Sequence, residues 1–456
     1  MNMPYKLAAT DLVRLFLGHK LTPIEALDAC LDRIAAIDER VKAFTHVDAA
    51  GARQAALAAT ERYSAGLPLG PLDGVPISIK DNLFVAGMPC TWGSALYRDF
   101  VPHTDDLVVR SIRQAGIVIV GKTNTPELAM AGYTDNYLFG PTGNPWHNDL
   151  SPGGSSGGAA ASVGFGMVPL AIGTDAGGSI RRPASHCGLV GLKPGIGRVP
   201  RRYGFPALAG DLQVVSPIAR TSRDLLVLFA AIATVPKQGR LGQESFRIGI
   251  IDADPSAAIE PEISKGFDVA VKLLRNLGHV TVSAPRLWNP NEVSMHFDTL
   301  VSAGVGRVLS PHEGWEAIVT PAIAQLGRAG LTSSASTYVE SLDWTQSFRG
   351  RMLALMADFD LLALPTTAAV AWPKREPAPA TINNATARPG DAAANTTFVN
   401  FAGLPAISVP LPVPDTSLPA GLQLIAPLHA EERLLTVAQA IELNAPWRLP
   451  GLDYNG

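Results

Sequence analysis

The chain has 456 residues, of which 47% are hydrophobic, and a net charge of −3. Length alone suggests two or three domains, although large α/β enzymes often form one, and the apolar fraction is sufficient for a sizeable core. The small net charge gives no broad basic surface for nucleic acid or an anionic membrane. Its 43 glycines and 37 prolines are too few for a wholly disordered chain.

Signals of cellular location favour the cytoplasm. The first twenty residues lack the pattern of a signal peptide. The longest apolar run, near Leu225–Val235, is too short to span a bilayer. Three cysteines lack metal-binding or redox spacing, so we expect buried thiols in a reducing compartment: Cys30, Cys90 and Cys187.

Residues 1–66 are predicted to form a helical cap. Thr22 and Glu25 have the spacing of a capping box, and Pro23 between them suits the first position of a helix. Apolar residues then recur at helical spacing, at Ile24, Leu27, Leu31 and Ile34. A second helix is expected at Ala49–Tyr63. The cap would therefore precede the first strand of the core.

The segment Val75–Lys80 is predicted to be that strand. Alternation along a strand places Ser78 and Lys80 on one face, with two isoleucines on the other. Because burying a lysine charge is costly, an inward-facing lysine is rarely only structural. The alternative is a solvated lysine, or one paired with Asp81. Strand alternation argues against that pairing, since Asp81 should point to the opposite side.

Strands and helices then alternate to the end of the chain. Helices are predicted near Asp106–Gln114 and Pro126–Ala131, from Thr221, at Ser264–Leu277 and from Glu431. Strands are predicted at Ile117–Val120, Arg247–Ile251, Val280–Val282, Asp360–Leu364, Ala406–Val409 and Leu422–Ile425. Residues 285–345 carry no motif and are expected to select the substrate. Thr381–Thr397 is predicted to be a long loop that acts as a lid or binding element.

Two serine clusters framed by glycine stand at the centre of the chain, at Gly153–Gly158 and Asp175–Ser179. Between them, Ala159–Val163 is predicted to be a helix and Met167–Ile172 a buried strand, which would bring the second cluster back beside the first. Glycine permits backbone angles that other residues resist. Bare N–H groups can then face a shared space, as is useful where negative charge develops on a reacting oxygen.

These clusters resemble the amidase signature family. The matching motifs are GGSSGG at Gly153–Gly158, GTDAGGSIRRPA at Gly173–Ala184 and GVPISIKDN at Gly74–Asn82. Ser155 lies 75 residues after the lysine of the last motif and 24 before the serine of the second, as in the family. Further similarity extends almost from end to end, at Gly121–Ala129, Phe139–Trp146, Phe401–Pro410 and Gly421–Pro427.

The resemblance implies one domain over residues 1–456. Its fold would be a single α/β/α sandwich, in which helices cover both sides of a large mixed β-sheet, and the strand–helix alternation is compatible with this. Residues 74–235 would form the signature core, and 346–456 the C-terminal part of the core.

The resemblance also assigns catalytic roles. Ser179 would be the acylating nucleophile, Ser155 a proton relay and Lys80 the base, and the peptide bond before Ser155 would be cis. A lysine base must be largely neutral near pH 7, and desolvation shifts its pKa in that direction. Ser78 and Ser155 are expected to be its neutral partners. No cofactor and no metal are expected.

The loop before the nucleophile is the expected oxyanion hole. Its backbone N–H donors would come from Ala176, Gly177, Gly178 and Ser179, although a merely tight turn is the alternative. Asp175 is expected to hold this loop through hydrogen bonds.

Three further positions near the site receive expectations. Arg181 should hold the nucleophile loop together with its aspartate. Arg182 is either structural or, if it reaches the pocket, a bidentate partner for a substrate carboxylate. By family position, Met130 and its alanine neighbours would line the acyl site, or they are ordinary core.

Two other motifs compete with this interpretation. Gly116–Thr123 matches a phosphate-binding loop, but the residues between its glycines have the pattern of a strand, so Lys122 is expected to be structural. Gly153–Gly157 matches a nucleophile elbow, which would require a preceding strand and a suitable histidine. His186, His279 and His429 lie in no such context.

The leading hypothesis is a free-standing amide hydrolase in which water frees the acid from a Ser179 acyl-enzyme. Its substrate class stays open among linear amides, anilides (as for an aryl acylamidase), urethanes and esters. The alternative is the glutaminase subunit of a tRNA-dependent amidotransferase, and a remote third is an ATP-binding protein. The expected partner is a small-molecule amide, without nucleic acid or membrane, for a monomer or homodimer.

Overall fold

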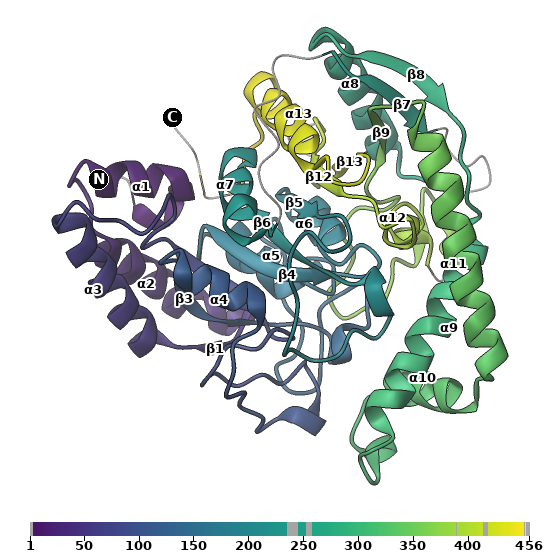
Figure 1. Ribbon diagram of the computed structural model, residues 1–456, viewed down its shortest axis with the longest axis horizontal. Coiled ribbons are helices and arrows are strands. Elements are labelled where there is room, and N and C mark those ends of the chain that lie inside the picture. The colour runs from purple at the N-terminus through teal and green to yellow at the C-terminus, as the bar shows by residue number, and fades with distance from the viewer. Residues whose placement is uncertain are drawn as a thin grey trace.

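A sheet of eleven strands forms the centre of the computed structural model, which describes residues 3–234, 245–251, 258–388, 390–413, 418–450 and 452 (Figure 1). From one edge to the other, its strands are β1 (Phe44–Val47), β3 (Val118–Thr123), β2 (Pro76–Lys80), β4 (Leu170–Asp175), β6 (Val214–Ala219), β5 (Val190–Lys193), β12 (Ala406–Pro410), β13 (Gly421–Ile425), β9 (Leu361–Pro365), β7 (Arg247–Ile251) and β8 (Val280–Ala284).

The sheet is mixed, as predicted. β2 is parallel to β3 and β4, and β7 is parallel to β8 and β9. The other neighbouring pairs are antiparallel. The central strands are buried on both faces, which explains their continuous apolar patterns.

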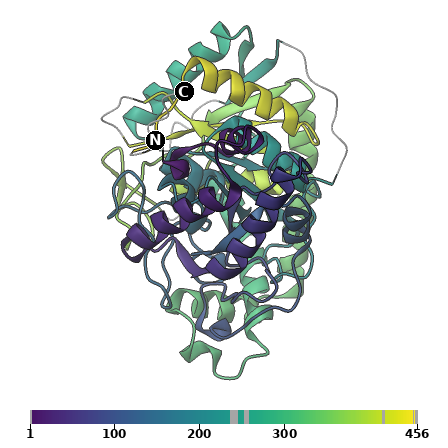
Figure 2. The ribbon, with the colours of Figure 1, turned by 90° about the vertical axis from the view of Figure 1, so that its left-hand side faces the viewer.

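Helices cover both faces of this sheet (Figures 1 and 2). One core cluster packs the first face against α2 (Pro23–Val41), α3 (Ala49–Ser64), α5 (Gly157–Gly164) and α6 (Arg181–Cys187). A second packs the other face against α1 (Ala9–Leu17), α4 (Leu107–Gln114), α7 (Ser222–Ile232), α8 (Pro261–Asn276) and α13 (Glu431–Asn444). This is the expected α/β/α sandwich.

A third group of helices lies at one side of the sandwich, opposite the N-terminal helices (Figure 1). It consists of α9 (Pro290–Leu309), α10 (Pro321–Thr332), α11 (Ala335–Met356) and the short α12 (Thr397–Ala402). Their apolar side chains share a separate core cluster with Trp92 and Leu128, which come from connections of the signature core. The boundary between this group and the sheet is where the functional site is found.

The N-terminal region is less independent than predicted. The capping box of Thr22 and Glu25 is confirmed, but β1 within residues 1–66 pairs with β3 as an edge strand of the main sheet. The first backbone N–H groups of α1 donate to the carboxylate of Asp224, more than two hundred residues later. The region is thus mostly helical, as predicted, but it also contributes an edge strand to the main sheet.

Other local predictions fail where the backbone takes unusual angles. The helix expected at Pro126–Ala131 is only a 3-10 turn, η3 (Glu127–Ala129), because Leu128 and Ala129 have φ values of 51° and 60°. The expected loop at Thr381–Thr397 contains a two-stranded ribbon, β10 (Thr381–Ile382) with β11 (Ala385–Thr386). The remaining 3-10 turns are η1 (Pro4–Lys6), η2 (Ala95–Tyr97), η4 (Gly210–Leu212), η5 (Trp315–Ala317) and η6 (Asp391–Ala393).

The cysteines behave as predicted: each is buried and carries a free thiol. Within the ranges that the structure describes, no helix combines the length and apolar character needed to cross a membrane.

Candidate active site

Lys80 ends β2 with its side chain fully buried. Strand alternation sends Ile77 and Ile79 into the core cluster on one face, so Lys80 points to the other, toward the N-terminal end of α5. There its Nζ lies within hydrogen-bonding distance of three hydroxyls: Ser155 Oγ at 2.8 Å, Ser156 Oγ at 3.0 Å and Thr174 Oγ1 at 3.2 Å.

The surroundings of Lys80 favour its neutral form. Burial lowers the pKa of this amine well below its ordinary value, and the positive charges of Arg201 and Arg182 act in the same direction. The carboxylate of Asp175 opposes them without reversing the shift. Lys80 therefore has what a proton acceptor requires, namely a lone pair in reach of a hydroxyl.

The expectations for the residues around Lys80 are only partly confirmed. Ser78 is not its partner, because the Ser78 hydroxyl bonds with the Ser162 hydroxyl of α5 at 2.9 Å. Ser156 and Thr174 take the expected place of Ser78. Asp81 does point to the other side, as predicted, where its carboxylate contacts Lys122 Nζ at 3.1 Å.

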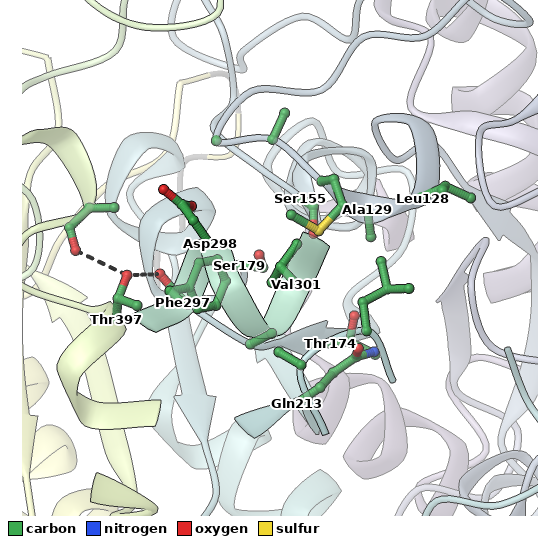
Figure 3. Close-up of a pocket in the computed structure, with 18 of the residues that line it drawn as sticks. Leu128, Ala129, Ser155, Thr174, Ser179, Gln213, Phe297, Asp298, Val301 and Thr397 are labelled. Carbon is green, nitrogen blue, oxygen red and sulfur yellow. Dashed lines mark hydrogen bonds between the residues drawn. The ribbon is translucent and has the colours of Figure 1, made fainter. Parts of the chain in front are cut away.

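Ser155 and Ser179 come from the two glycine-framed clusters and line one cavity (Figure 3). Ser155 lies just before α5, and the peptide bond between Gly154 and Ser155 is cis, as the resemblance implied. Ser179 follows β4 in the turn before α6. Their exposed fractions are 2% and 7%, so both hydroxyls are enclosed but reachable from the cavity. The helix–strand connection thus brings the clusters together, as the sequence predicts.

Residues 175–179, which carry the expected nucleophile Ser179, are called the nucleophile loop here, and their backbone N–H groups are not equivalent. The N–H of Gly178 already donates to Asp175 Oδ1 at 2.8 Å, so it is engaged and does not fit the expected oxyanion hole. In the described chain, the N–H groups of Ala176, Gly177 and Ser179 have no such acceptor. Gly178 has a φ of +112°, which a side chain would oppose.

Asp175 and Arg181 hold this loop, as predicted. Their buried side chains form an ion pair at 2.8 Å, and Arg181 donates in addition to Gln423 Oε1 and to the carbonyl of Thr396. Asn400 Nδ2 donates to the same Asp175 carboxylate. Although burial alone would raise the pKa of Asp175, the Arg181 guanidinium holds it well below its usual range. The loop is therefore held by this ion pair and by contacts to Thr396, Asn400 and Gln423 from the C-terminal part of the chain.

The cavity has a volume of about 280 Å³, slightly below the range of roughly 300–1,000 Å³ for drug-sized ligands. Met130, with Ala129 and Ala131, lines one wall, as expected. Sequence reasoning did not identify the opposite wall, which comes from Ser294, Phe297, Asp298 and Val301 of α9, and from Gly390, Ala393 and Thr397. These lie in the two segments predicted to select or cover the substrate, but no motif distinguished them individually.

Arg182 also reaches the cavity, near the start of α6. Its side chain is partly buried, and burial lowers its pKa to about 10, so the guanidinium keeps its charge near neutral pH. The second charged residue of the lining, Asp298, is exposed, and burial of part of its carboxyl raises its pKa. The site therefore contains one cation and one anion in addition to its hydroxyls.

The competing motifs lack their required contexts. The residues of Gly116–Thr123 that were expected to form a strand lie largely in β3, and Lys122 pairs with Asp81 rather than facing a loop. His186 of α6 is buried against the ring of Trp372, and burial lowers the pKa of His186 to about 4. No histidine is among the described residues that line the cavity. Over the described ranges, no group of three His, Cys, Asp or Glu side chains could hold a metal ion.

Comparison with known proteins agrees with this geometry. The family model described as Amidase matches residues 25–435. The chain is 37% identical to a subunit of the glutamyl-tRNA(Gln) amidotransferase from Acidothermus cellulolyticus, over 95% of this chain and 93% of that protein.

Solved structures show the same architecture. A bacterial aryl acylamidase superposes with a TM-score of 0.88 at 27% identity, covering 97% of this chain and 96% of that one. The corresponding glutamyl-tRNA(Gln) amidotransferase subunit of Thermotoga maritima gives 0.79 at 28% identity, with 99% of both chains covered. Since both the motifs and the family model extend over most of its length, the chain belongs to the amidase signature family.

Proposed function

We propose that the chain hydrolyses the carbon–nitrogen bond of a small amide through an acyl-enzyme on Ser179. The observation that carries this proposal is the 2.8 Å hydrogen bond between Lys80 Nζ and Ser155 Oγ, at a cavity that Ser179 also lines. A serine hydroxyl is a weak nucleophile and needs a base. The buried lysine, with its lowered pKa, is the group that can supply one.

In the proposed first half-reaction, Ser179 Oγ bonds to the amide carbonyl carbon. Its proton passes to Ser155, whose own proton passes to Lys80 Nζ. The N–H groups of Ala176, Gly177 and Ser179 would receive the carbonyl oxygen as it becomes negative. When the carbon–nitrogen bond breaks, the proton returns from Lys80 through Ser155 to the departing nitrogen.

In the second half-reaction, water replaces the amine. It bonds to the acyl carbon while its proton follows the same route to Lys80, and the ester bond to Ser179 then breaks as the proton returns to Ser179 Oγ. The products are a free acid and ammonia or an amine. Anilides, urethanes and esters could be cleaved by the same acyl transfer, and they belong in the substrate panel.

Intact-mass measurement with a serine-directed probe tests the nucleophile. Wild type should gain one adduct and Ser179→Ala none, whereas Ser162→Ala, which alters a buried hydroxyl outside the cavity lining, should still be labelled. Labelling of Ser179→Ala to the wild-type extent would refute the assignment. The cytoplasmic location remains part of the proposal and is tested by cell fractionation.

A second candidate is the glutaminase subunit of a tRNA-dependent amidotransferase. The specific observation in its favour is the 37% identity, over 95% of the chain, to a subunit of a glutamyl-tRNA(Gln) amidotransferase. Sequence relatives therefore support this setting more directly than a free-standing hydrolase. The chemistry at Ser179 would be the same, with glutamine as the amide and ammonia passed to a partner protein.

Glutaminase activity with and without partner proteins separates the two settings. Purified alone, a free-standing hydrolase should turn over simple amides at full rate. An amidotransferase subunit should hydrolyse glutamine slowly when it is purified alone. The rate should be much higher when it is purified together with co-expressed partner proteins and glutamyl-tRNA is added. Robust turnover of unrelated amides without any partner would exclude the second candidate.

A further inference from the structure

Arg182 is a charged group in the cavity that forms no ion pair with any described residue. Its Nε is enclosed and has no acceptor among the described residues. Its backbone N–H donates to the carbonyl of Gly178 at 2.9 Å. Enclosing a donor without an acceptor costs free energy, so the arrangement favours an acceptor that arrives with a ligand.

The neighbouring Arg181 provides the contrast. Its guanidinium is satisfied by Asp175, Gln423 and the carbonyl of Thr396. Two consecutive arginines thus differ completely: one is fully used in holding the nucleophile loop, and the other keeps its hydrogen-bonding capacity at the cavity. Burial alone does not account for the missing acceptor of Arg182 Nε, because Arg181 is more deeply buried and its guanidinium still has hydrogen-bond partners.

Two glycines make room for the Arg182 side chain. A Cβ atom at Gly132 would lie 2.7 Å from Arg182 Nη1, and one at Gly178 would lie 3.0 Å from its Nε. Gly178 belongs to the loop that carries Ser179, so the guanidinium lies directly beside the nucleophile loop. An anion held there would be only a short distance from the bond to be cleaved.

Asp298 does not take this role. It lines the same cavity but forms no ion pair with Arg182, and its exposed side chain can be satisfied by water. A single guanidinium matches one negative charge in bidentate geometry, which fits a carboxylate better than a phosphate group of about −2. The small cavity volume also limits the ligand to a short molecule.

We propose that the substrate amide carries a carboxylate, which Arg182 binds, and that the substrate is therefore a short ω-amido acid. This inference rests on the proposed function, since it names the substrate class of the same site. The carboxylate fixes one end of the molecule, so its amide carbonyl is presented to Ser179. Neutral amides of equal length would lack this contact.

Calorimetry on Ser179→Ala tests binding without turnover. Three matched pairs differ only by carboxylate against methyl: succinamate and butanamide, glutaramate and pentanamide, adipamate and hexanamide. At least one acid should bind about 10- to 100-fold more tightly than its neutral partner, as expected for a charge-assisted hydrogen bond. Adding Arg182→Gln should abolish that preference, and Arg182→Lys should retain part of it. Asp298→Asn is the matched control and should preserve the preference.

Equal binding within all three pairs, or a preference that survives Arg182→Gln, would overturn the inference. Failure of the proposed function has a different signature. In that case wild type would be neither acylated nor able to hydrolyse any member of the series, whatever the binding data show. Binding and turnover are thus separate readouts.

Discussion

β2 and β3 lie side by side, and each carries a fully buried lysine near its end, but the two lysines have opposite surroundings. Lys80 is surrounded by hydroxyls, and burial lowers its pKa. Burial alone would also lower the pKa of Lys122, but its neighbours Cys90 and Asp81 hold this pKa above its usual value, and the Asp81 carboxylate forms an ion pair with it.

Burial alone therefore does not make a lysine a base. Both amines are equally removed from water, and the partner decides which protonation state is stable. A carboxylate turns Lys122 into a permanent counter-ion. Neutral hydroxyls leave Lys80 able to take up and release a proton. Substitutions of Lys80, Lys122, Thr174 and Arg182 test this difference between the two lysines.

The largest effect is expected for Lys80→Met. This variant keeps the length of the side chain but removes the proton acceptor, so kcat/KM for an amide should fall by about 10²- to 10⁴-fold. The reaction rate and urea unfolding should be measured together, because a folded but inactive protein is the expected result. Near-normal turnover would exclude Lys80 as the base.

Lys122→Met should instead damage stability. It leaves the carboxylate of Asp81 buried without its charge partner, at a cost of about 3–5 kcal/mol in the free energy of unfolding. Activity per folded molecule should stay close to that of wild type. The double variant Lys122→Met/Asp81→Asn should regain part of the stability. A loss of kcat without destabilisation would contradict the assigned difference between the lysines.

A smaller effect is expected for Thr174→Val. The substitution removes one of the three hydroxyls that contact Lys80 Nζ, and also the acceptor of Asn82 Nδ2 at 2.9 Å. Loss of one such hydrogen bond should reduce kcat/KM by roughly two- to tenfold. Thr174→Ser keeps the hydroxyl and should behave like wild type, and equal activity of both variants would mean that this contact is dispensable.

The smallest effect is expected on the pH profile of kcat/KM. In the proposed mechanism, turnover requires neutral Lys80, so kcat/KM should rise as pH increases through its lowered pKa and then level off. The positive charge of Arg182 helps to lower this pKa, so Arg182→Gln should move the rising limb to higher pH. The profile is measured with a neutral amide, which has no carboxylate for Arg182 to bind. An unmoved limb would show that Arg182 does not influence Lys80.

Local patterns in the sequence predicted much of the fold. The capping box of Thr22 and the strand that ends at Lys80 were recognisable because both are specified by nearby residues. Edge strand β1 was missed, since its pairing with β3 depends on residues far along the chain. The turn at Leu128 was misread as a helix because no glycine announces its positive φ.

Some residues of the candidate site could likewise be identified from the sequence and others could not. The resemblance to the amidase signature family singled out Lys80, Ser155 and Ser179, and in the structure Lys80 Nζ contacts Ser155 Oγ at a cavity that both serines line. Sequence could not choose Thr174 over Ser78 as a partner of Lys80, because that choice depends on where α5 and β4 pack against β2. Phe297 in the cavity wall was likewise out of reach, since α9 has no motif and approaches only through tertiary packing.

The attachment of Arg181 to Thr396 and Gln423 has a consequence for the synthesis of the protein. The nucleophile loop is translated before the chain is half complete, but its supports emerge from the ribosome only near the end. A nascent chain, or one cut short before Thr396 by a premature stop codon, has the local ion pair of Asp175 with Arg181 but lacks the contacts of Arg181 to Thr396 and Gln423. We therefore expect a product truncated before Thr396 to lack the hydrolysis proposed for Ser179, because the loop that carries this serine is incompletely held.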